Sequence, residues 1–358
     1  MKYIFGTGAM RSGGALVLSI LELDKNTKAF CEIYYFSRHI FKKYNQLNNV
    51  VTKHKIAYNF YLILKYRNKI IIKYEKIFTI LKKKKINDYE SLYIILANIL
   101  IENKRYKNFV EYGNGEWRFI EKFLEFNSKF KAFLIIRDPR SVISSFKKIS
   151  HGSKYDYLNC IFNWIDSYDY LKKLKKRYSE KRFLGLKFED IHKDPKKNTI
   201  KICNFLGITY KSSFIKNKSF KKIKNTSLTF SALNKKPSYG FSVKRNNQWE
   251  DYLTKWEIAV IENLCGSRMK ELQYELKNLD KKELQKGMEK LKKNILIKKR
   301  LQFFKKTNLG TNLRANDPAK PENWSSKKNS LKKFIEDDEY EKYISEVKYY
   351  KILQKGLR

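Results

Sequence analysis

The residues best suited to chemistry are arginines and serines in two short segments of the chain, residues 6–14 and 137–145. The first segment, GTGAMRSGG, follows the apolar run MKYIF and precedes an apolar stretch that begins at Ala15. Glycines let backbone N–H groups approach an anion closely, and the first turn of a helix adds unpaired N–H donors. Arg11 adds a fixed positive charge to this loop. The pattern therefore predicts a strand, a phosphate-binding loop and a helix.

The second segment lies in KAFLIIRDPRSVISSF, residues 131–146, which reads as a buried strand followed by a helix. The strand ends before Arg137, Asp138 is suited to cap the helix, and Pro139 already has the backbone angle of a first helical position. Ser145 follows about two helical turns later. Arg137 and Ser145 are therefore expected to face one anion.

The loop at residues 6–14 departs from two common phosphate-binding motifs. The P-loop requires G-x-x-x-x-G-K-[ST], and no Lys-Ser or Lys-Thr pair follows the last glycine here. The dinucleotide fingerprint requires a third glycine where Arg11 stands, and an acidic residue at the end of a second strand near position 30. A kinase or NTPase with a degenerate P-loop stays open as an alternative, and it predicts binding of ATP with magnesium.

The elements that must position these residues alternate between strand and helix. Such alternation predicts a parallel sheet covered by helices, and ligands of such sheets bind beyond the carboxyl ends of the strands. Residues 8–14, Glu111, Arg137 and Phe188 all lie at or just after expected strand ends, Glu111 as the last residue of a strand over 109–111. One shared site at that edge of the sheet is therefore predicted.

In combination, these motifs resemble the sulfotransferases that use 3′-phosphoadenosine 5′-phosphosulfate. The loop resembles their 5′-phosphosulfate loop, and the segment from Arg137 to Ser145 has the spacing of their 3′-phosphate site. Later segments add to the resemblance, which covers about residues 1–276 with gaps: KFEDI at 187–191, DP at 194–195, CNFLG at 203–207, NTS at 225–227, and Arg245 with Trp249. The expected fold is an α/β three-layer sandwich with a central parallel sheet and a P-loop-like phosphate-binding loop.

The resemblance implies transfer of the sulfuryl group from that donor to a hydroxyl or amine acceptor, without a metal. A carbohydrate, another glycan, a lipid, a small molecule and a protein tyrosine all stay open as the acceptor. The residues assigned to the nucleotide are Gly8, Arg11, Ser12, Gly13, Gly14, Ala15, Leu16, Arg137, Ser145, Phe188 and Arg245. The residues assigned to catalysis are Arg11 on the donor side and Glu111 as general base, with Glu116 and His39 as alternatives to Glu111.

Two departures from the family pattern fall inside this expected site. Gly14 and Ala15 stand where the family usually has Thr or Ser, so the expected donors there are backbone N–H groups. Tyr112 follows Glu111 where the corresponding segment of related carbohydrate sulfotransferases, E-K-[ST]-P, has a lysine.

The composition is strongly basic, with 78 Lys and Arg against 36 Asp and Glu and a net charge of +42. Such a charge suits nucleic acid or an anionic membrane surface, so a non-catalytic basic module is a second alternative. The lysines are spread over the whole chain beside abundant Ile, Asn and Tyr, which indicates a general compositional bias. No specific nucleic acid is therefore expected, and peripheral membrane contact stays open.

The remaining expectations concern organisation and location. We expect a sulfotransferase domain over 1–278, with a helical insertion at 37–106 on the acceptor side, and a basic helical extension over 279–358. The four cysteines are far apart in apolar surroundings and are expected to be buried free thiols. The first strand begins at residue 2, and no apolar run reaches the length of a membrane span. A cytoplasmic enzyme is therefore predicted.

Overall fold

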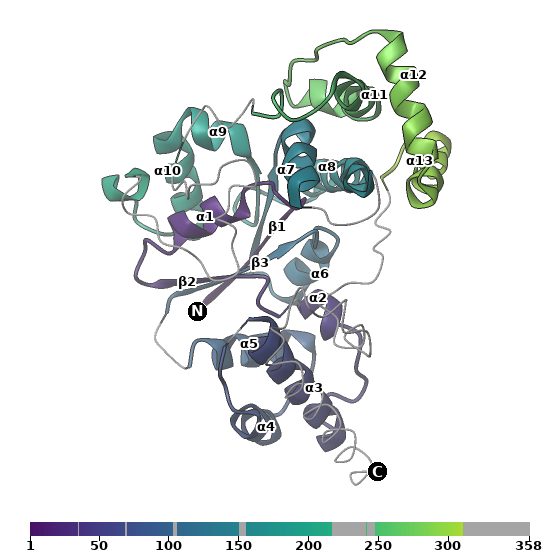
Figure 1. The fold of residues 1–358 in the computed structure, drawn as a ribbon. Coiled ribbons are helices and arrows are strands. Elements are labelled where there is room, and N and C mark those ends of the chain that lie inside the picture. Colours follow the sequence, from purple (N-terminus) through teal and green to yellow (C-terminus); the bar gives the residue numbers. More distant parts are fainter. Residues whose placement is uncertain are drawn as a thin grey trace. The chain divides into compact units, whose positions relative to one another are not determined.

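The computed structural model describes residues 1–34, 36–68, 70–102, 106–149, 155–216, 241 and 248–310. These residues belong to two compact units, drawn in Figure 1. The first consists of Met1–Cys31 with the described part of Tyr106–Leu313, and the second is formed by Glu32–Arg105. Residues 225–227, Arg245 and the part of the expected extension after residue 310 lie outside the described part of the chain.

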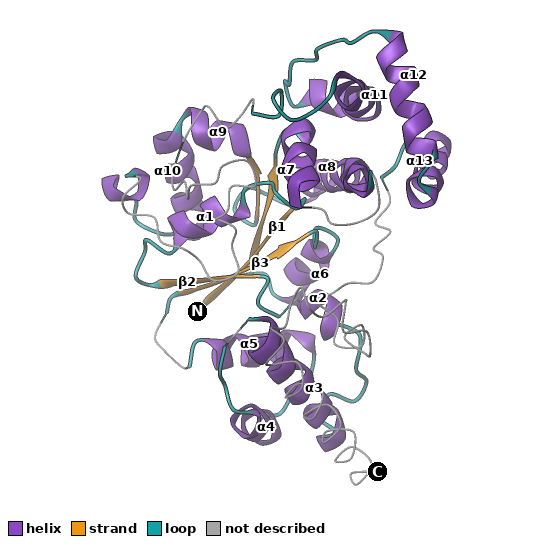
Figure 2. Ribbon diagram, in the orientation of Figure 1, coloured by secondary structure: helices purple, strands orange, loops and turns teal. Residues whose placement is uncertain are grey.

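The first unit is built on a sheet of five parallel strands in the order β2-β3-β1-β4-β5 (Figure 2). The strands are β1 (Lys2–Gly8), β2 (Thr27–Cys31), β3 (Asn108–Asn114), β4 (Lys131–Ile136) and β5 (Phe183–Lys187). From β1 the chain runs to the β2 edge, whereas from β3 it crosses to β4 on the other side of β1. The carboxyl ends of β1 and β4 therefore meet where the strand order reverses, which is where ligands of such sheets bind.

Helices cover both faces of this sheet, because the central strands bury side chains on both sides. On one face, residues of α1 (Gly14–Leu21), α9 (Phe188–Lys193) and α10 (Pro195–Leu206) share a core with the strands. On the other, α6 (Phe119–Phe126) packs aromatic rings against β1, as in the edge-on contact of Phe5 with Phe119 at 5.3 Å. The predicted three-layer α/β fold is confirmed.

Of the remaining helices that the structure describes in this unit, two lie between β4 and β5 in the chain and three follow β5. They are α7 (Pro139–Ile149), α8 (Cys160–Arg177), α11 (Lys255–Glu271), α12 (Lys281–Lys292) and α13 (Ile295–Thr307), with short 3₁₀ turns at Asp156–Asn159 and Ser212–Ile215. Pro139 begins α7 as predicted, and the Asp138 carboxylate accepts the N–H of Arg140 at 2.8 Å. Helix α10 begins at Pro195 because the side chain of Asp194 caps it by accepting the N–H of Lys197.

The second unit is helical. It contains α2 (Phe36–His39), α3 (Val50–Leu62), a π-helical turn (Ile63–Arg67), α4 (Tyr74–Lys83) and α5 (Tyr89–Leu100). Its core is aromatic, with Tyr34 edge-on to Phe60 at 5.2 Å and Phe36 edge-on to Tyr93 at 5.1 Å. The helices expected at 37–106 are thus present, whereas their place on the acceptor side and the domain limits 1–278 and 279–358 stay predictions.

Two further observations concern the chain as a whole. Cys31, Cys160, Cys203 and Cys265 are all buried free thiols, as predicted. Within the described ranges, none of the helices is both long enough and apolar enough to cross a membrane.

Candidate active site

The loop between β1 and α1 makes a tight turn with two residues in the left-handed backbone region. Arg11 has φ of 70° and Gly13 has φ of 99°, and the N–H of Ser12 donates to the carbonyl of Ala9 at 3.1 Å. A left-handed conformation is uncommon for a residue other than glycine and is enriched at functional sites. Gly13 then caps α1, so the first N–H groups of that helix, including those of Gly14 and Ala15, belong to the loop.

The loop lies directly on its neighbours at two glycines. A β-carbon on Gly13 would lie 2.1 Å from Cδ2 of Phe188, and one on Gly14 would lie 2.2 Å from Cζ of Tyr112. Neither position has room for a side chain unless the aromatic ring moves. The packing of Gly14 against Tyr112 of β3 therefore explains why no Thr or Ser stands at position 14.

Side chains from both sequence segments meet at this loop. The Nε of Arg11 donates to Oγ of Ser145 at 2.8 Å, and Nη1 of Arg137 donates to the carbonyl of Arg11 at 3.0 Å. These residues lie 134 and 126 positions apart in the sequence. The structure thus brings together the loop, the end of β4 and the second turn of α7, while the roles of these residues stay predictions.

The electrostatics of this cluster favour an anion. Burial, and then the positive charge of Arg137, lower the pKa of Arg11 to about 10, so Arg11 still carries its charge at neutral pH. The Arg137 guanidinium lies 4.4 Å from the ring centroid of Phe188, where the ring face favours a cation. An anion bound beside the two guanidinium groups would offset their repulsion through charge-assisted hydrogen bonds.

Hydroxyl and backbone donors complete the cluster. The hydroxyl of Ser12 is buried and makes no hydrogen bond with any other residue that the structure describes. Ser145 is 4% exposed. The N–H of Leu16, in contrast, already donates to the carbonyl of Gly13 at 3.1 Å. A ligand phosphate at the loop would therefore find a hydroxyl donor at Ser12, and the assignment of Leu16 to the nucleotide stays a prediction.

Phe188 and Trp249, the two aromatic residues singled out in the sequence, are both in the core. Phe188 is the first residue of α9 and not the last residue of β5. It carries Arg137 on one side and packs against His192, with ring centroids 4.4 Å apart. Trp249 packs on Arg140, whose guanidinium lies 4.0 Å from its ring centroid. Phe188 therefore borders the cluster, whereas Trp249 supports the start of α7.

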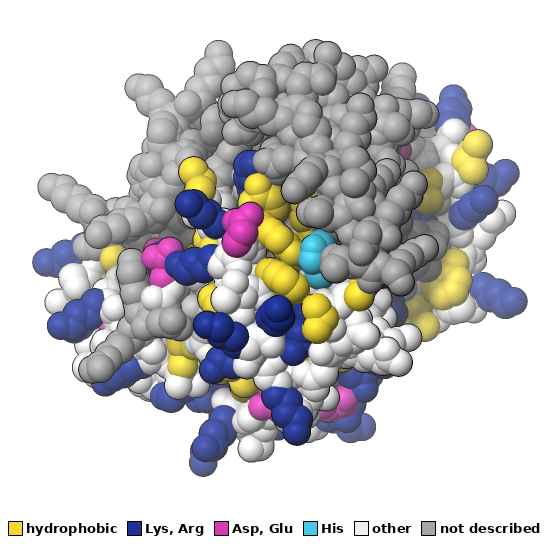
Figure 3. Space-filling model, turned by 90° about the horizontal axis from the view of Figure 1, so that it is seen from below, with side chains coloured by type: hydrophobic (Ala, Val, Ile, Leu, Met, Phe, Trp, Pro, Cys, Tyr) yellow, Lys and Arg dark blue, Asp and Glu magenta, His cyan; other side chains and the backbone are white. Residues whose placement is uncertain are grey.

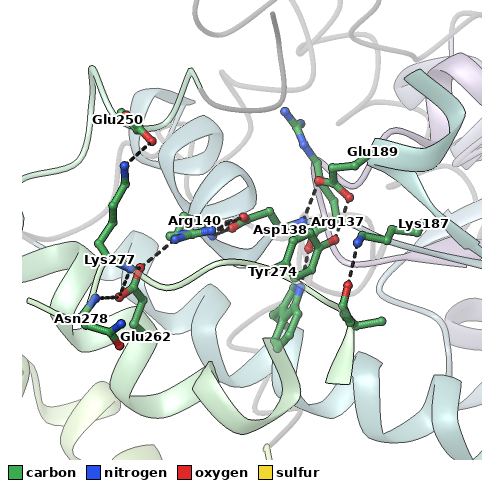
Figure 4. Close-up of polar contacts among 12 residues, drawn as sticks. Arg137, Asp138, Arg140, Lys187, Glu189, Glu250, Glu262, Tyr274, Lys277 and Asn278 are labelled. Atoms are coloured by element: carbon green, nitrogen blue, oxygen red, sulfur yellow. Dashed lines mark hydrogen bonds and ion pairs between the residues drawn. The ribbon is translucent and has the colours of Figure 1, made fainter. Parts of the chain in front are cut away.

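A buried polar network, drawn in Figure 4, holds the segment that carries Arg137. The N–H of Asp138 donates to Glu189 Oε1 at 2.9 Å, and the hydroxyl of Tyr274 donates to Glu189 Oε2 at 2.7 Å. Arg140 pairs with both Asp138 and Glu262 at 2.7 Å. Burial raises the pKa of Glu189 above the ordinary carboxyl value and raises the pKa of Tyr274 well above its own.

Sequence reasoning missed the members of this network that lie far from the two motifs. Glu189 is inside the quoted KFEDI segment but received no role, and Glu262 and Tyr274 were not singled out. An acidic residue directly after the end of a buried strand was the one available signal for Glu189. The partners on α11 and after it carry no local pattern that distinguishes them.

The candidate bases have different surroundings. Glu111 lies inside β3, three residues before its end at Asn114, and not at the strand end expected from the sequence. It is 1% exposed and is in register with Phe5 and Phe30. The N–H of Glu116 donates to Oγ1 of Thr7 at 2.9 Å, so Glu116 adjoins the end of β1. His39 is buried in α2 of the second unit.

Positive charge is not confined to this cluster. Lys and Arg side chains are scattered over the described part of the face drawn in Figure 3, with few acidic side chains between them.

Within the described ranges, no group of three or more His, Cys, Asp or Glu residues is arranged to hold a metal ion.

Comparison with known proteins agrees with this geometry. The model of the sulfotransferase family matches residues 4–212, which is more than half of the chain. This chain belongs to the sulfotransferase family. The match includes the loop, the end of β4 and the first helix after β5.

Individual relatives are distant. Sulfotransferase 2A1 of Macaca fascicularis is 27% identical over 176 residues, which cover 42% of this chain and 60% of that protein. The sulfotransferase domain from the curacin biosynthetic pathway has a similar fold, with a TM-score of 0.51 and 15% identity over 76% of this chain and 98% of that domain. The chain thus matches less than two thirds of the length of its curated relative, and the solved domain supports the fold alone.

Proposed function

We propose that this protein is a sulfotransferase that uses 3′-phosphoadenosine 5′-phosphosulfate as donor and a hydroxyl or amine group as acceptor. The observation that carries the proposal is the contact of Arg11 with both Ser145 and Arg137, which links the loop to the segment after β4. The donor carries phosphate groups at the 5′ and 3′ positions of one ribose. The loop with Ser12 and the neighbouring pair Arg137 and Ser145 offer one group of donors for each.

We assign the residues of the site as follows. The N–H groups of Gly14 and Ala15 and the hydroxyl of Ser12 bind the 5′ side, with Gly8 and Gly13 shaping the loop. Arg137 and Ser145 bind the 3′-phosphate, and Arg11 lies between the two groups. Phe188 borders the adenine, and Arg245, outside the described residues, is kept as a second ligand of the 3′-phosphate.

The bound donor supplies the sulfuryl group and the leaving phosphate. Arg11, Ser12 and the loop N–H groups stabilise negative charge that develops on the leaving oxygen. A carboxylate takes the acceptor proton, and Glu111 is our first assignment with Glu116 as the competitor. As in phosphoryl transfer, positioning and electrostatics account for most of the catalysis.

The wider setting is part of the same proposal. The helices of residues 37–106 contribute to the acceptor side, and the acceptor is a glycan, lipid or small molecule. The catalytic domain extends over 1–278, followed by a basic extension over 279–358, and the enzyme acts in the cytoplasm.

Calorimetry of the full chain tests the donor. We expect adenosine 3′,5′-bisphosphate to bind at least about tenfold more tightly than AMP, because AMP lacks the partner of Arg137 and Ser145. Equal affinities for the two nucleotides would contradict the proposal. Tight binding of ATP with magnesium would favour a degenerate kinase or NTPase, and salt-sensitive binding of DNA or RNA alone would favour a basic module.

A further inference from the structure

Helix α13 is firmly attached to the first unit by its inner side. Arg300 is 1% exposed and donates to the carbonyl of Asn159 at 3.0 Å and to Oδ1 of Asn163 at 2.6 Å. At the end of the helix, Arg268 donates to the carbonyl of Asn308 at 2.6 Å. The outer side of α13 is therefore held in a fixed orientation and does not depend on a partner for its folding.

That outer side combines apolar and basic side chains. Ile295, Lys299, Phe303 and Lys306 share one face by their helical spacing, opposite the buried Ile297 and Leu301. Of the seven large apolar side chains that are exposed in the described part of the chain, two lie here, Ile295 at 74% and Phe303 at 42%, and a third, Leu309 at 50%, follows two residues after the helix ends at Thr307. Exposed apolar side chains grouped in this way mark an interaction surface more often than single ones do.

Positive charge is dense around these side chains. Residues 281–307 contain eleven Lys and Arg and two Glu, so about two fifths of this stretch is basic against 78 of 358 residues in the chain. Helices α12 and α13 lie beside each other at one edge of the first unit (Figure 1). The exposed apolar side chains thus emerge from the most basic helical pair that the structure describes.

A hollow beside Ile295 adds to this surface. It opens between the α12–α13 junction and the residues before α8, and its lining includes Tyr155, Lys290 and Lys293. The Lys290 ammonium lies 4.4 Å from the ring centroid of Trp256 and 5.9 Å from that of Tyr155. The acidic residue of the hollow, Asp156, accepts a hydrogen bond from Asn294 at 2.7 Å. Lys290 and Lys293 beside the exposed Ile295 could contact the phosphate of a lipid headgroup while Ile295 contacts its acyl chains.

We propose that the outer face of α13, formed by Ile295 and Phe303 with the lysines of α12 and α13, docks on an anionic phospholipid membrane together with the exposed Leu309 that follows the helix. Apolar side chains enter the interface between headgroups and acyl chains, while lysines contact the lipid phosphates. Both features are needed, because general positive charge alone would not select this face of a protein that is basic everywhere.

Flotation of the full chain with lipid vesicles tests the docking surface. We expect binding to vesicles of phosphatidylcholine mixed with phosphatidylserine and little binding to phosphatidylcholine alone. The combined variant Ile295→Ser, Phe303→Ser, Leu309→Ser keeps the charge and should lower the partition coefficient by at least about tenfold. The control Val50→Ser, Ile71→Ser removes two exposed apolar side chains of the second unit and should bind like the parent.

A second pair of variants separates local from general charge. Replacing Lys298, Lys299 and Lys306 by Glu should abolish binding, whereas replacing the exposed Lys176, Lys196 and Lys197 by Glu should lower it only slightly. Equal losses in both variants, or unchanged binding of the serine variant, would overturn the proposal. So would binding of single-stranded RNA through the α13 lysines without vesicle binding. Affinity for adenosine 3′,5′-bisphosphate, measured on each variant, reports the donor site separately.

Discussion

Gly14 and Tyr112 are fitted to each other: a β-carbon on Gly14 would lie 2.2 Å from Cζ of the Tyr112 ring. Both residues depart from the pattern of the family, in which a hydroxyl residue and a lysine are expected at these positions. The two departures therefore belong together: the Tyr112 ring of β3 packs on the loop, and a residue without a side chain is needed at position 14 to make room for it.

Substitution of Gly14 by Ser should therefore destabilise the protein by about 1–3 kcal/mol, since the ring must move to admit the side chain. The double variant Gly14→Ser, Tyr112→Leu lacks the ring atoms that the serine would contact. It should therefore lose less free energy of unfolding than the sum of the two single variants. Urea denaturation of the four proteins of this cycle measures the coupling. Gly266→Ser is the control, because a β-carbon there has its nearest neighbour at an ordinary 3.6 Å. Additive effects at Gly14 and Tyr112 would contradict the fit.

Arg137→Ala should lower the affinity for adenosine 3′,5′-bisphosphate by about ten- to more than a hundredfold, because a charge-assisted contact contributes about 1.5–3 kcal/mol. The affinity for AMP should change much less, since AMP lacks the 3′-phosphate. Calorimetry with both nucleotides measures the two effects, and the exposed Lys176→Ala controls for loss of a positive charge. Equal losses for both nucleotides would place Arg137 elsewhere than at the 3′-phosphate.

Glu111→Gln should lower kcat by roughly 10²–10⁴ while bisphosphate affinity stays within a few-fold, if Glu111 is the general base. The measurement is product formation from labelled donor with an acceptor found by screening. Glu116→Gln is the matched variant, because Glu116 lies just after the same strand and adjoins Thr7. A loss of kcat in Glu116→Gln alone would transfer the role to Glu116.

Glu189→Gln should change how stability depends on pH. Burial raises the pKa of Glu189 above its ordinary value of 4.5, so its protonated form is favoured in the folded protein. The parent therefore loses free energy of unfolding, relative to the Gln variant, as the pH rises from about 4.5 through the raised pKa. Urea denaturation across this range measures the difference. Glu180→Gln, at a side chain that is 80% exposed, should show no such trend, and the same trend in both variants would refute the assignment.

The sequence was informative where structure is local. The apolar runs of β1 and β4, the glycines of the loop and the Asp-Pro start of α7 all depend on neighbours within a few residues. Arg137 and Ser145 could be paired because a strand end and a helix of known pitch fix their separation.

Other features depend on distant packing and could not be read in this way. Gly113 looks like a break after a short strand, yet β3 continues through it because it pairs with Thr7 of β1, whose hydroxyl also donates to the Gly113 carbonyl at 2.7 Å. Glu111 consequently lies inside the strand. The bond from Asp138 to Glu189 spans 51 positions and the one from Arg140 to Glu262 spans 122.

The network around Arg140 also bears on where the protein can be cut. The family match ends at residue 212, but two partners of the network come later in the chain. Glu262 pairs with the buried Arg140, and the hydroxyl of Tyr274 donates to the buried Glu189. A fragment that stops at 212 would leave Arg140 with Asp138 as its remaining described ion-pair partner and would remove the Tyr274 hydroxyl from Glu189, which weakens the network that holds the Arg137 segment. A piece of this chain that keeps this network intact therefore has to include α11 and the residues that follow it through Tyr274.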